Sequence, residues 1–315
     1  MINRRLLRIK VFKVLFSRIY SGKESYQAAE KELLLSCEKT LDLFYFLLKM
    51  PVELRKIASD KIESGLQKFH PTPQEANPNR KFVENKFIAK LDENKELNDY
   101  CSKKGLLWQP YIPFLKNLIK EISTKDYYVE YMNSEVVSFS QDKKLIATII
   151  REELEDNEEL YEIMEDLNLY WGDDIAYVAD VILKSITHVS ENGKINFPDV
   201  FIKEEDEQYA LRLLTHSMLH FDEYVGVMSK FVLNWEPERL AFTDTCLIVL
   251  GISEAVAFPS IPLKVTINEF VEISKFYSTQ NSKVFVNGIL EKVVLGLQKE
   301  GKIEKTGRGL VGSID

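Results

Sequence analysis

The sequence predicts an all-α protein. Apolar residues recur at helical spacing through nearly the whole chain, and no segment alternates convincingly between apolar and polar residues as a half-buried strand does. Prolines, glycines and asparagines interrupt these runs at intervals, as loops between helices require. The 315 residues are 45% hydrophobic and 29% charged, a composition typical of a globular protein with room for two domains.

The first half of the chain predicts a short basic helix and then a long amphipathic one. Asn3 is a suitable N-cap for a helix that runs to about residue 20. An amphipathic run covers 24–50, and we expect Pro51 to end it and to open the next helix. Residues 70–81 contain three prolines and two asparagines and are expected to form a loop. Shorter helices are expected at about 82–104, 109–122 and 124–133.

The second half is divided by a turn-rich break at 190–198, "SENGKINFP". The last residues, 301–315, contain four glycines and little apolar surface, which predicts a flexible tail. Three of the remaining helices are expected before this break, at about 141–154, 157–170 and 173–190. Five more are expected between the break and the tail, at about 204–222, 224–234, 238–257, 263–277 and 282–299.

The net charge of −8 would by itself argue against a nucleic-acid-binding protein, but the charge is unevenly distributed. Residues 1–20 carry six lysines and arginines and no acid, whereas residues 151–174 carry eleven acids and one arginine. One interpretation is that the basic helix pairs with this acidic segment on the protein surface. A basic amphipathic helix can also lie on an anionic membrane.

A third interpretation concerns the start of the basic helix. Arg4 and Arg5 fall in the first turn, where the helix dipole is positive and acids are normally preferred. Such a local conflict is often found where a function requires it. Exposed first-turn N–H groups beside clustered arginines form an anion site that suits phosphates.

Several site types find no support in the sequence. The three cysteines are far apart and no C-x-x-C occurs, so neither a disulfide framework nor a zinc site is predicted, and a reducing cytoplasm is expected. His216 and His220 share a helix face with Asp222 or Glu223 nearby, but no H-E-x-x-H pattern accompanies them. Phosphate-loop, dinucleotide-binding and G-x-S-x-G patterns are absent. We therefore expect no enzyme activity, cofactor or metal, and no uncharged run predicts a signal peptide or membrane span.

Two stretches together resemble the NusB family. The basic start, "RRLLRIKVFKVLFSRIYSG", is similar to the N-terminal helix of that family. Residues 247–293 resemble its C-terminal half more closely, because "IPLKVTINE" and "KVFVNGILEKV" occur about a dozen residues apart. The family is a small all-helical domain, so this chain is about twice its usual length. The resemblance implies a NusB-like bundle built from 1–50 and 204–300, a helical insertion of unknown role at 51–203, and the tail at 301–315.

The resemblance also implies a non-enzymatic function. NusB proteins are transcription antitermination factors that bind the boxA segment of nascent RNA. They act as a heterodimer with a small-subunit ribosomal protein, NusE, and help the RNA polymerase elongation complex to read through ribosomal RNA operons. A second hypothesis is a helical protein–protein scaffold in ribosome assembly that no longer binds RNA, which the net negative charge favours.

The resemblance implies site residues by position. Glu254 in "GISEA" matches a glutamate at the partner surface, while Asn281, Val284 and Val249 depart from the family pattern. We interpret Asn268 and Asn287 as buried polar residues with structural roles and expect Gly288 to allow close approach of another helix. The RNA-binding positions carried over from the family are Arg4, Arg5, Arg8, Lys10, Phe16, Lys264, Asn281, Ser282, Lys283 and Phe285.

Overall fold

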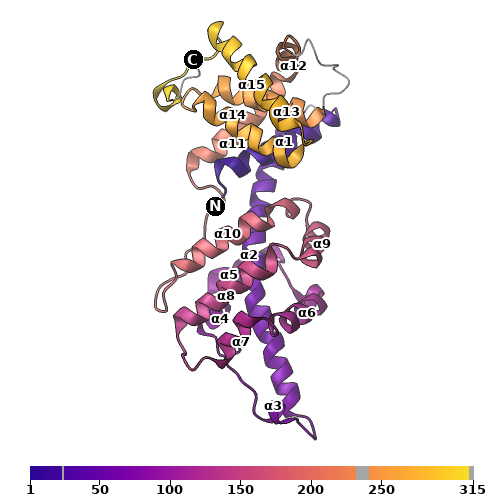
Figure 1. Ribbon diagram of the computed structural model, residues 1–315, viewed down its shortest axis with the longest axis vertical. Helices are drawn as coiled ribbons and strands as arrows, with labels where there is room; N and C mark the ends of the chain where they lie inside the picture. Colours follow the sequence, from indigo (N-terminus) through magenta and orange to yellow (C-terminus); the bar gives the residue numbers. More distant parts are fainter. Residues whose placement is uncertain (23–24, 232–240, 312–315) are drawn as a thin grey trace. The chain divides into compact units, whose positions relative to one another are not determined.

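The computed structural model describes residues 1–22, 25–231 and 241–311 (Figure 1). Within these ranges the β-structure consists of one isolated bridge, between Ile2 and Phe201. The all-α prediction is therefore confirmed. The helices are α1 (Arg4–Tyr20), α2 (Tyr26–Leu66), α3 (Pro73–Ala76), α4 (Lys86–Asp92), α5 (Lys95–Lys104), α6 (Ile112–Ile122), α7 (Asp126–Asn133), α8 (Phe139–Leu154), α9 (Glu158–Leu167), α10 (Ile175–Thr187), α11 (Glu204–Leu219), α12 (Phe221–Ser229), α13 (Phe242–Ala257), α14 (Leu263–Tyr277) and α15 (Ser282–Lys299).

The chain divides into two compact units. Unit 1 comprises Glu38–Val200 together with Met1, and unit 2 comprises Ile2–Cys37 and Phe201–Asp315. The chain thus passes from unit 2 to unit 1 within α2 and returns after residue 200. The expected insertion, 51–203, has these limits in outline, but its first boundary falls earlier in the structure. The roles expected of these parts stay predictions.

Pro51 lies inside α2, so the break expected at this residue is wrong. A proline within a helix removes one backbone hydrogen bond and costs about 3 kcal/mol. Pro51 is itself buried, and Met50, Val52 and Leu54 beside it are fully buried. Each such aliphatic side chain contributes roughly 1.5–3 kcal/mol on burial, which outweighs the lost hydrogen bond.

Asparagine caps set the helix boundaries that follow. The single helix expected at 82–104 is two helices, because Asn94 caps α5 by accepting a hydrogen bond from the Leu97 N–H at 2.9 Å. The expected loop at 70–81 contains the one-turn helix α3, where Thr72 and Glu75 form a capping box. The helices expected at 224–234 and 238–257 correspond to α12 and α13 where they are described, and 232–240 lies outside the described residues.

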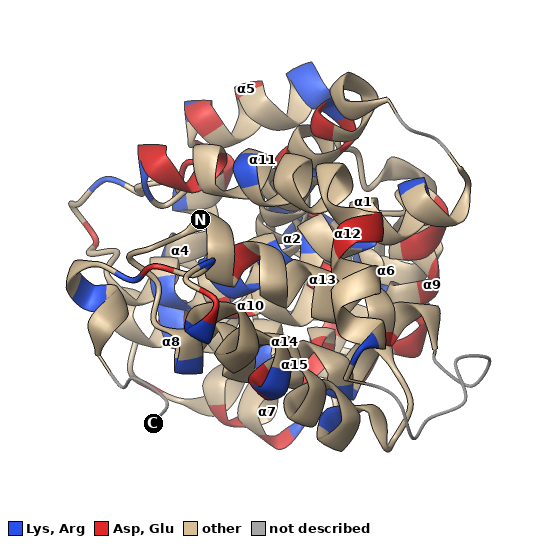
Figure 2. Cartoon of the chain, turned by 90° about the horizontal axis from the view of Figure 1, so that it is seen from above, with Lys and Arg blue, Asp and Glu red and all other residues tan. Residues whose placement is uncertain are grey.

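In unit 1, α8 packs against α4, α7 and α10. Two indole N–H groups bond to carbonyls of α2: Trp108 to Phe46 at 2.9 Å and Trp171 to Lys39 at 2.7 Å. These bonds satisfy the polar atom of each buried ring. The acidic residues of α9 stand out in Figure 2, while most other helices carry interspersed acids and bases.

Unit 2 is built around α13, which packs against α1, α11, α12, α14 and α15. Most of its residues are buried, as expected of a helix that is apolar around its whole circumference. Gly251 allows α15 to approach, because a Cβ at this position would lie 2.6 Å from Leu290 Cδ2. The close approach expected at Gly288 is wrong, since a Cβ there would meet nothing within 4 Å. Asn268 and Asn287 are exposed, so the expectation that they are buried is also wrong.

The described part of the expected flexible tail is packed onto unit 2. Ile303 is buried, and Lys305 Nζ donates hydrogen bonds to the carbonyls of Ala255 and Phe258 at 2.8 and 3.0 Å. The Thr306 N–H donates to the Pro259 carbonyl at 3.1 Å. The low apolar content of this segment predicted a flexible tail, but hydrogen bonds from the backbone and from Lys305 hold its described part in place. Residues 312–315 of the expected tail lie outside the described residues.

Candidate nucleic-acid interface

The N-terminus of α1 has the geometry that the sequence predicts. Asn3 Oδ1 accepts a hydrogen bond from the Leu6 N–H at 2.9 Å, which makes Asn3 the N-cap. The first turn contains no acid and carries Arg4 and Arg5. The positive end of the helix dipole and two guanidinium groups therefore lie at the same point.

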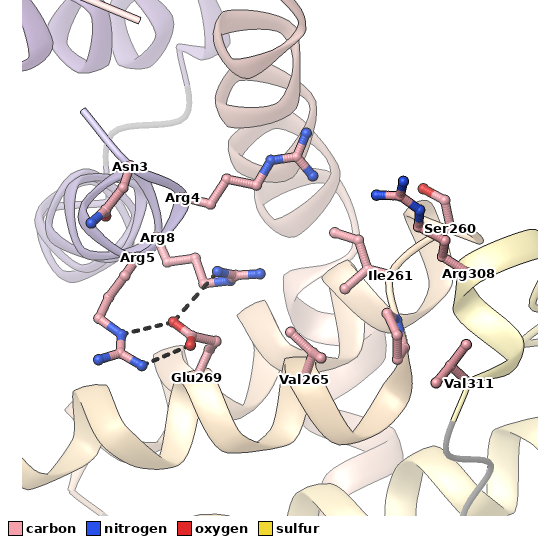
Figure 3. Close-up of a pocket in the computed structure, with 11 residues that line it drawn as sticks. Asn3, Arg4, Arg5, Arg8, Ser260, Ile261, Val265, Glu269, Arg308 and Val311 are labelled. Atoms are coloured by element: carbon pink, nitrogen blue, oxygen red, sulfur yellow. Dashed lines mark hydrogen bonds and ion pairs between the residues drawn. The ribbon is translucent and has the colours of Figure 1, made fainter. Parts of the chain in front are cut away.

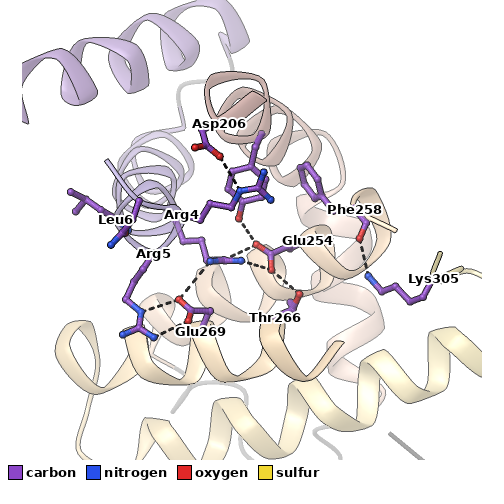
Figure 4. Close-up of polar contacts among 12 residues, drawn as sticks. Arg4, Arg5, Leu6, Asp206, Glu254, Phe258, Thr266, Glu269 and Lys305 are labelled. Carbon is purple, nitrogen blue, oxygen red and sulfur yellow. Dashed lines mark hydrogen bonds and ion pairs between the residues drawn. The ribbon is translucent and has the colours of Figure 1, made fainter. Parts of the chain in front are cut away.

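Arg8 and Glu254 form a buried ion pair between α1 and α13. Arg8 Nε and Nη2 donate to the two Glu254 carboxylate oxygens at 2.7 and 3.0 Å, and the side chain of Arg8 is only 4% exposed. The Tyr209 hydroxyl also donates to Glu254. The Thr266 hydroxyl donates to the same carboxylate (Figure 4), so the remaining acceptor positions of Glu254 are filled. Burial alone would lower the pKa of Arg8, but the charge of Glu254 more than offsets it and keeps the guanidinium protonated.

This pair involves two residues to which the resemblance assigns binding roles, and those roles stay predictions. Arg8 was expected to hold an RNA phosphate, and Glu254 was expected at a partner surface. Both side chains lie inside the helical bundle and use their charges on each other, so neither is presented to a ligand in this structure. We interpret the pair as a structural tie between α1 and α13.

Arg5 lies at the surface and is held by one carboxylate. Its Nε and Nη2 donate to Glu269 at 2.9 and 2.7 Å, and its side chain is 54% exposed. Glu269 also lies 3.5 Å from Arg8 Nη1. The hydrogen bonds from Arg5 lower the pKa of Glu269, so this carboxyl is ionised at neutral pH.

Arg4 points toward the start of α11. Its Nε donates to Asp206 at 3.0 Å, its Nη2 lies 3.3 Å from Glu205, and its guanidinium stands 4.7 Å from the centre of the Tyr209 ring. The acids that pair with Arg4, Arg5 and Arg8 therefore come from α11, α13 and α14. These are different acids from the 151–174 segment that the sequence offered as a partner.

A cavity of about 670 Å³ opens beside these arginines (Figure 3). Pro262, the N-cap of α14, lines it together with Asn3, so two helix N-termini meet at its wall. Positive helix ends and guanidinium groups around one cavity favour an anion. The lining residues are Asn3, Arg4, Arg5, Arg8, Ser260, Ile261, Pro262, Val265, Glu269, Arg308 and Val311.

Three further residues expected to bind RNA are buried instead. Lys10 and Phe285 are 4% and 7% exposed, so both belong to the interior of unit 2. Ser282 is also buried, and its hydroxyl donates to Asp244 at 2.7 Å while accepting from the Thr279 N–H at 3.1 Å. Their roles in RNA binding stay predictions, and in this structure all three side chains are buried away from the surface.

The other expected positions in the C-terminal half are exposed. Lys264, Asn281 and Lys283 all lie at the surface of unit 2. Lys275 chiefly lowers the pKa of Glu272, and Arg5 and Lys283 add to the effect, which places these two cations in the field of one carboxylate.

Phe16 lies in an aromatic cluster that the sequence did not predict. Tyr20 stacks on it with ring centres 5.8 Å apart, and Phe242 meets both rings. The side chain of Tyr20 is 76% exposed, so the outer ring of the cluster faces solvent. The signal was present in the sequence, because residues four apart in a helix are neighbours.

Part of the chain is similar to a known protein family. Residues 190–295 match the model of the NusB family. Over these residues the chain is similar to the NusB family. Helix α1 lies outside the matched range and packs against α11 and α13, which lie within it.

Three relatives bear the name transcription antitermination protein NusB. The protein of Salinibacter ruber is 36% identical over 104 residues, which cover 33% of this chain and 65% of the relative. That of Chloroherpeton thalassium is 34% identical over 113 residues, 36% of this chain and 54% of the relative. That of Methylacidiphilum infernorum is 39% identical over 93 residues, 30% of this chain and 65% of the relative. The chain thus spans between half and two thirds of these relatives. No solved structure matches it.

The relatives are named for transcription antitermination and not for an enzyme, in agreement with the prediction of a non-enzymatic protein. Within the matched residues, His216 and His220 lie with ring centres 4.5 Å apart, and His220 Nδ1 is 2.7 Å from Glu223. Over the described ranges, no three His, Cys, Asp or Glu side chains are placed to hold a metal ion. No helix in the same ranges is long and apolar enough to cross a membrane.

Proposed function

We propose that the chain is a cytoplasmic transcription antitermination factor that binds boxA-type nascent RNA. In this proposal it acts with the small-subunit ribosomal protein NusE and with the RNA polymerase elongation complex to promote read-through of ribosomal RNA operons. The similarity to the NusB family and the names of the relatives support the general assignment. The RNA and both partners are our inference.

The observation that carries the proposal is the cavity at the N-terminus of α1. It combines an exposed arginine, Arg5, with a first helical turn that contains no acid. A guanidinium can donate two hydrogen bonds to a pair of phosphodiester oxygens. The N–H groups of a first helical turn also attract these negatively charged oxygens. Arg4 lines the same cavity and would extend this backbone contact.

Base recognition is assigned to the aromatic cluster of α1. Tyr20 is exposed and already stacked on Phe16, so its outer face can receive an unpaired base. Sequence-specific RNA recognition normally targets such single-stranded bases, whereas phosphate contacts fix position. Lys264, Asn281 and Lys283 are the exposed positions through which α14 and the start of α15 would take part.

The test is a titration of fluorescent boxA-type RNA and a scrambled control, with and without the ribosomal protein, at two salt concentrations. For wild type we expect a preference for boxA that increases with the partner. Arg5→Ala should weaken binding about fivefold and reduce the salt slope by about 0.7, the value for one phosphate contact to a single strand. Lys292→Ala removes one exposed charge from α15 and is the matched control. Equal affinity of wild type for boxA and scrambled RNA, with no effect of the partner, would disprove the proposal.

One observation favours the second hypothesis, a protein–protein scaffold in ribosome assembly. Of the ten positions carried over as RNA-binding, Arg8, Lys10, Ser282 and Phe285 are buried, which leaves a smaller RNA surface than the resemblance implies. A scaffold would form a stable complex with the ribosomal protein in the absence of RNA. In the titration above, this chain would also bind no RNA, and RNA would not strengthen its complex with the ribosomal protein.

A further inference from the structure

The cavity beside α1 contains one arginine that differs from the other three. Arg4, Arg5 and Arg8 each form ion pairs with carboxylates. Arg308 lines the same cavity, is exposed, and forms no ion pair with any residue that the structure describes. The positive charge that this cavity offers without first breaking an ion pair therefore comes from Arg308.

Arg308 is held at the cavity by the segment around it. Lys305 anchors the segment through two carbonyls at the end of α13, and the Thr306 N–H bonds to the Pro259 carbonyl. Residues Gly307–Leu310 then form a short 3₁₀ helix. Figure 3 shows Arg308 beside Ser260, on the side of the cavity opposite Arg5.

Gly309 makes this attachment possible. A Cβ at this position would lie 2.0 Å from the Pro259 carbonyl oxygen, a distance that no side chain can occupy. Backbone atoms, unlike the end of a flexible side chain, cannot move aside without shifting the loop between α13 and α14. The segment can therefore lie where it does only with glycine at this position.

We propose that Arg308 is a phosphate-binding residue of the RNA site, and that residues 305–310 act as a latch that positions it. This inference rests on the proposed function. It extends the site beyond the NusB-family match, which ends at residue 295. A phosphodiester between Arg5 and Arg308 would be held from two sides of the cavity by bidentate hydrogen bonds.

The other basic residues of the tail do not share this role. Lys302 pairs with Glu300 at 2.8 Å and does not line the cavity. Lys305 donates hydrogen bonds to two backbone carbonyls and thereby anchors the latch. Lys302 is thus a matched control for Arg308: it lies in the same segment, is exposed, and carries one positive charge.

The first experiment removes the charge. Arg308→Ala should weaken boxA RNA binding about fivefold and reduce the salt slope by about 0.7, because one phosphate contact is lost. Lys302→Ala should leave the slope unchanged. Arg308→Lys should keep the slope and recover part of the affinity, since an ammonium retains the charge but cannot form a bidentate contact.

The second experiment keeps the charge and changes its position. Gly309→Val retains Arg308 but should dislodge the latch, so we expect the same loss of affinity and slope as for Arg308→Ala. The double variant Arg308→Ala/Gly309→Val should lose no more than either single variant. Hydrogen exchange of residues 301–311 checks that the latch has opened and that the rest of unit 2 remains protected.

A third measurement separates this inference from the proposed function. Tripolyphosphate is titrated into wild type and Arg308→Ala while the Nε–H signals of the arginines are followed by NMR. If wild type binds tripolyphosphate through Arg308 but not boxA RNA, the phosphate site stands and the proposed function fails. If wild type binds RNA and Arg308→Ala binds it with equal affinity and slope, the inference is overturned and the proposed function stands. Failure of both ligands overturns both.

Discussion

The buried pair between Arg8 and Glu254 predicts a large difference between two arginines of the same helix. Arg8→Met leaves the Glu254 carboxylate fully buried, with two hydroxyl donors and no cation at hydrogen-bonding distance. Removing one partner of a buried ion pair costs roughly 3–5 kcal/mol. Arg5→Met breaks an exposed pair with Glu269, and such pairs contribute about 1 kcal/mol or less. Arg8→Met should therefore lower the free energy of unfolding of unit 2 by several times more than Arg5→Met.

The double variant Arg8→Met/Glu254→Gln isolates the interaction between the two charges. Glu254→Gln alone leaves Arg8 buried with only a distant contact to Glu269, 3.5 Å away, and we expect a cost of roughly 3 kcal/mol. In the double variant both charges are gone, and the glutamine oxygen can still accept from Tyr209 and Thr266. The two single effects should therefore exceed the effect of the double by about 2–3 kcal/mol.

The assay must report on unit 2 alone, because a chain of two units need not unfold in a single step. Hydrogen exchange measured by mass spectrometry on peptides from α1 and α13, at increasing urea concentration, gives the free energy of opening for these helices. Equal costs for Arg8→Met and Arg5→Met would contradict the reasoning. Additive single effects in the double-variant cycle would show that the two charges do not stabilise each other.

Three further predictions concern packing and pH. Gly251→Ala should lower the stability of unit 2 by about 1–2 kcal/mol, because the new Cβ would overlap the buried Leu290 side chain. Gly288→Ala should raise it by about 0.5–1 kcal/mol, because a Cβ there meets nothing within 4 Å and alanine is the better helix former. Urea unfolding of the two variants tests this difference. The pKa of Glu269 is lowered from its usual 4.5 by Arg5, so its stabilising contribution is present above pH 4.5 and is lost as the pH falls through the lowered value. The difference in unfolding free energy between wild type and Glu269→Gln should therefore shrink on acidification, and at neutral pH the variant should bind RNA more tightly because Arg5 is freed. Burial lowers the pKa of Lys305 from 10.5 to about 8. Between these pH values the folded state binds fewer protons than the unfolded state, so the latch becomes more stable as the pH rises. NMR titration of ¹³C-methylated lysines should show one group with a midpoint near 8, and the absence of such a group would contradict the burial of this amine.

The helices could be predicted from the sequence because their signal is local. Periodicity located nearly all of them, and Asn3 was recognisable as a cap from its neighbours alone. Pro51 was predicted to end a helix but lies inside α2. The free-energy cost of its missing hydrogen bond is outweighed by the burial of neighbouring side chains, which only the packed structure reveals. For the same reason, Gly288 was named as the site of close helix contact, although Gly251 on another helix fulfils that role.

The site was predictable only in part, because burial depends on residues far away in the chain. Arg8 is separated from its partner Glu254 by 246 positions, and no local pattern distinguishes it from Arg5. Arg308 gave no signal at all, since its segment is rich in glycine and poor in apolar residues. Its position depends on a backbone carbonyl at Pro259, which no pattern of side chains can indicate.

Burial therefore divides the arginines of one cluster by role. An ion pair does not prevent Arg5 from binding a phosphate, because an exposed pair is worth little and a phosphodiester can replace its carboxylate. The pair of Arg8 is different, since separating it would leave the Glu254 charge without a cation inside the protein. Arg308 has no carboxylate partner among the described residues, so no ion pair there must break before it contacts a phosphate. The order in which these three arginines respond to an anion should thus be Arg308 first, Arg5 next and Arg8 not at all, which the arginine Nε–H signals in a tripolyphosphate titration would reveal directly.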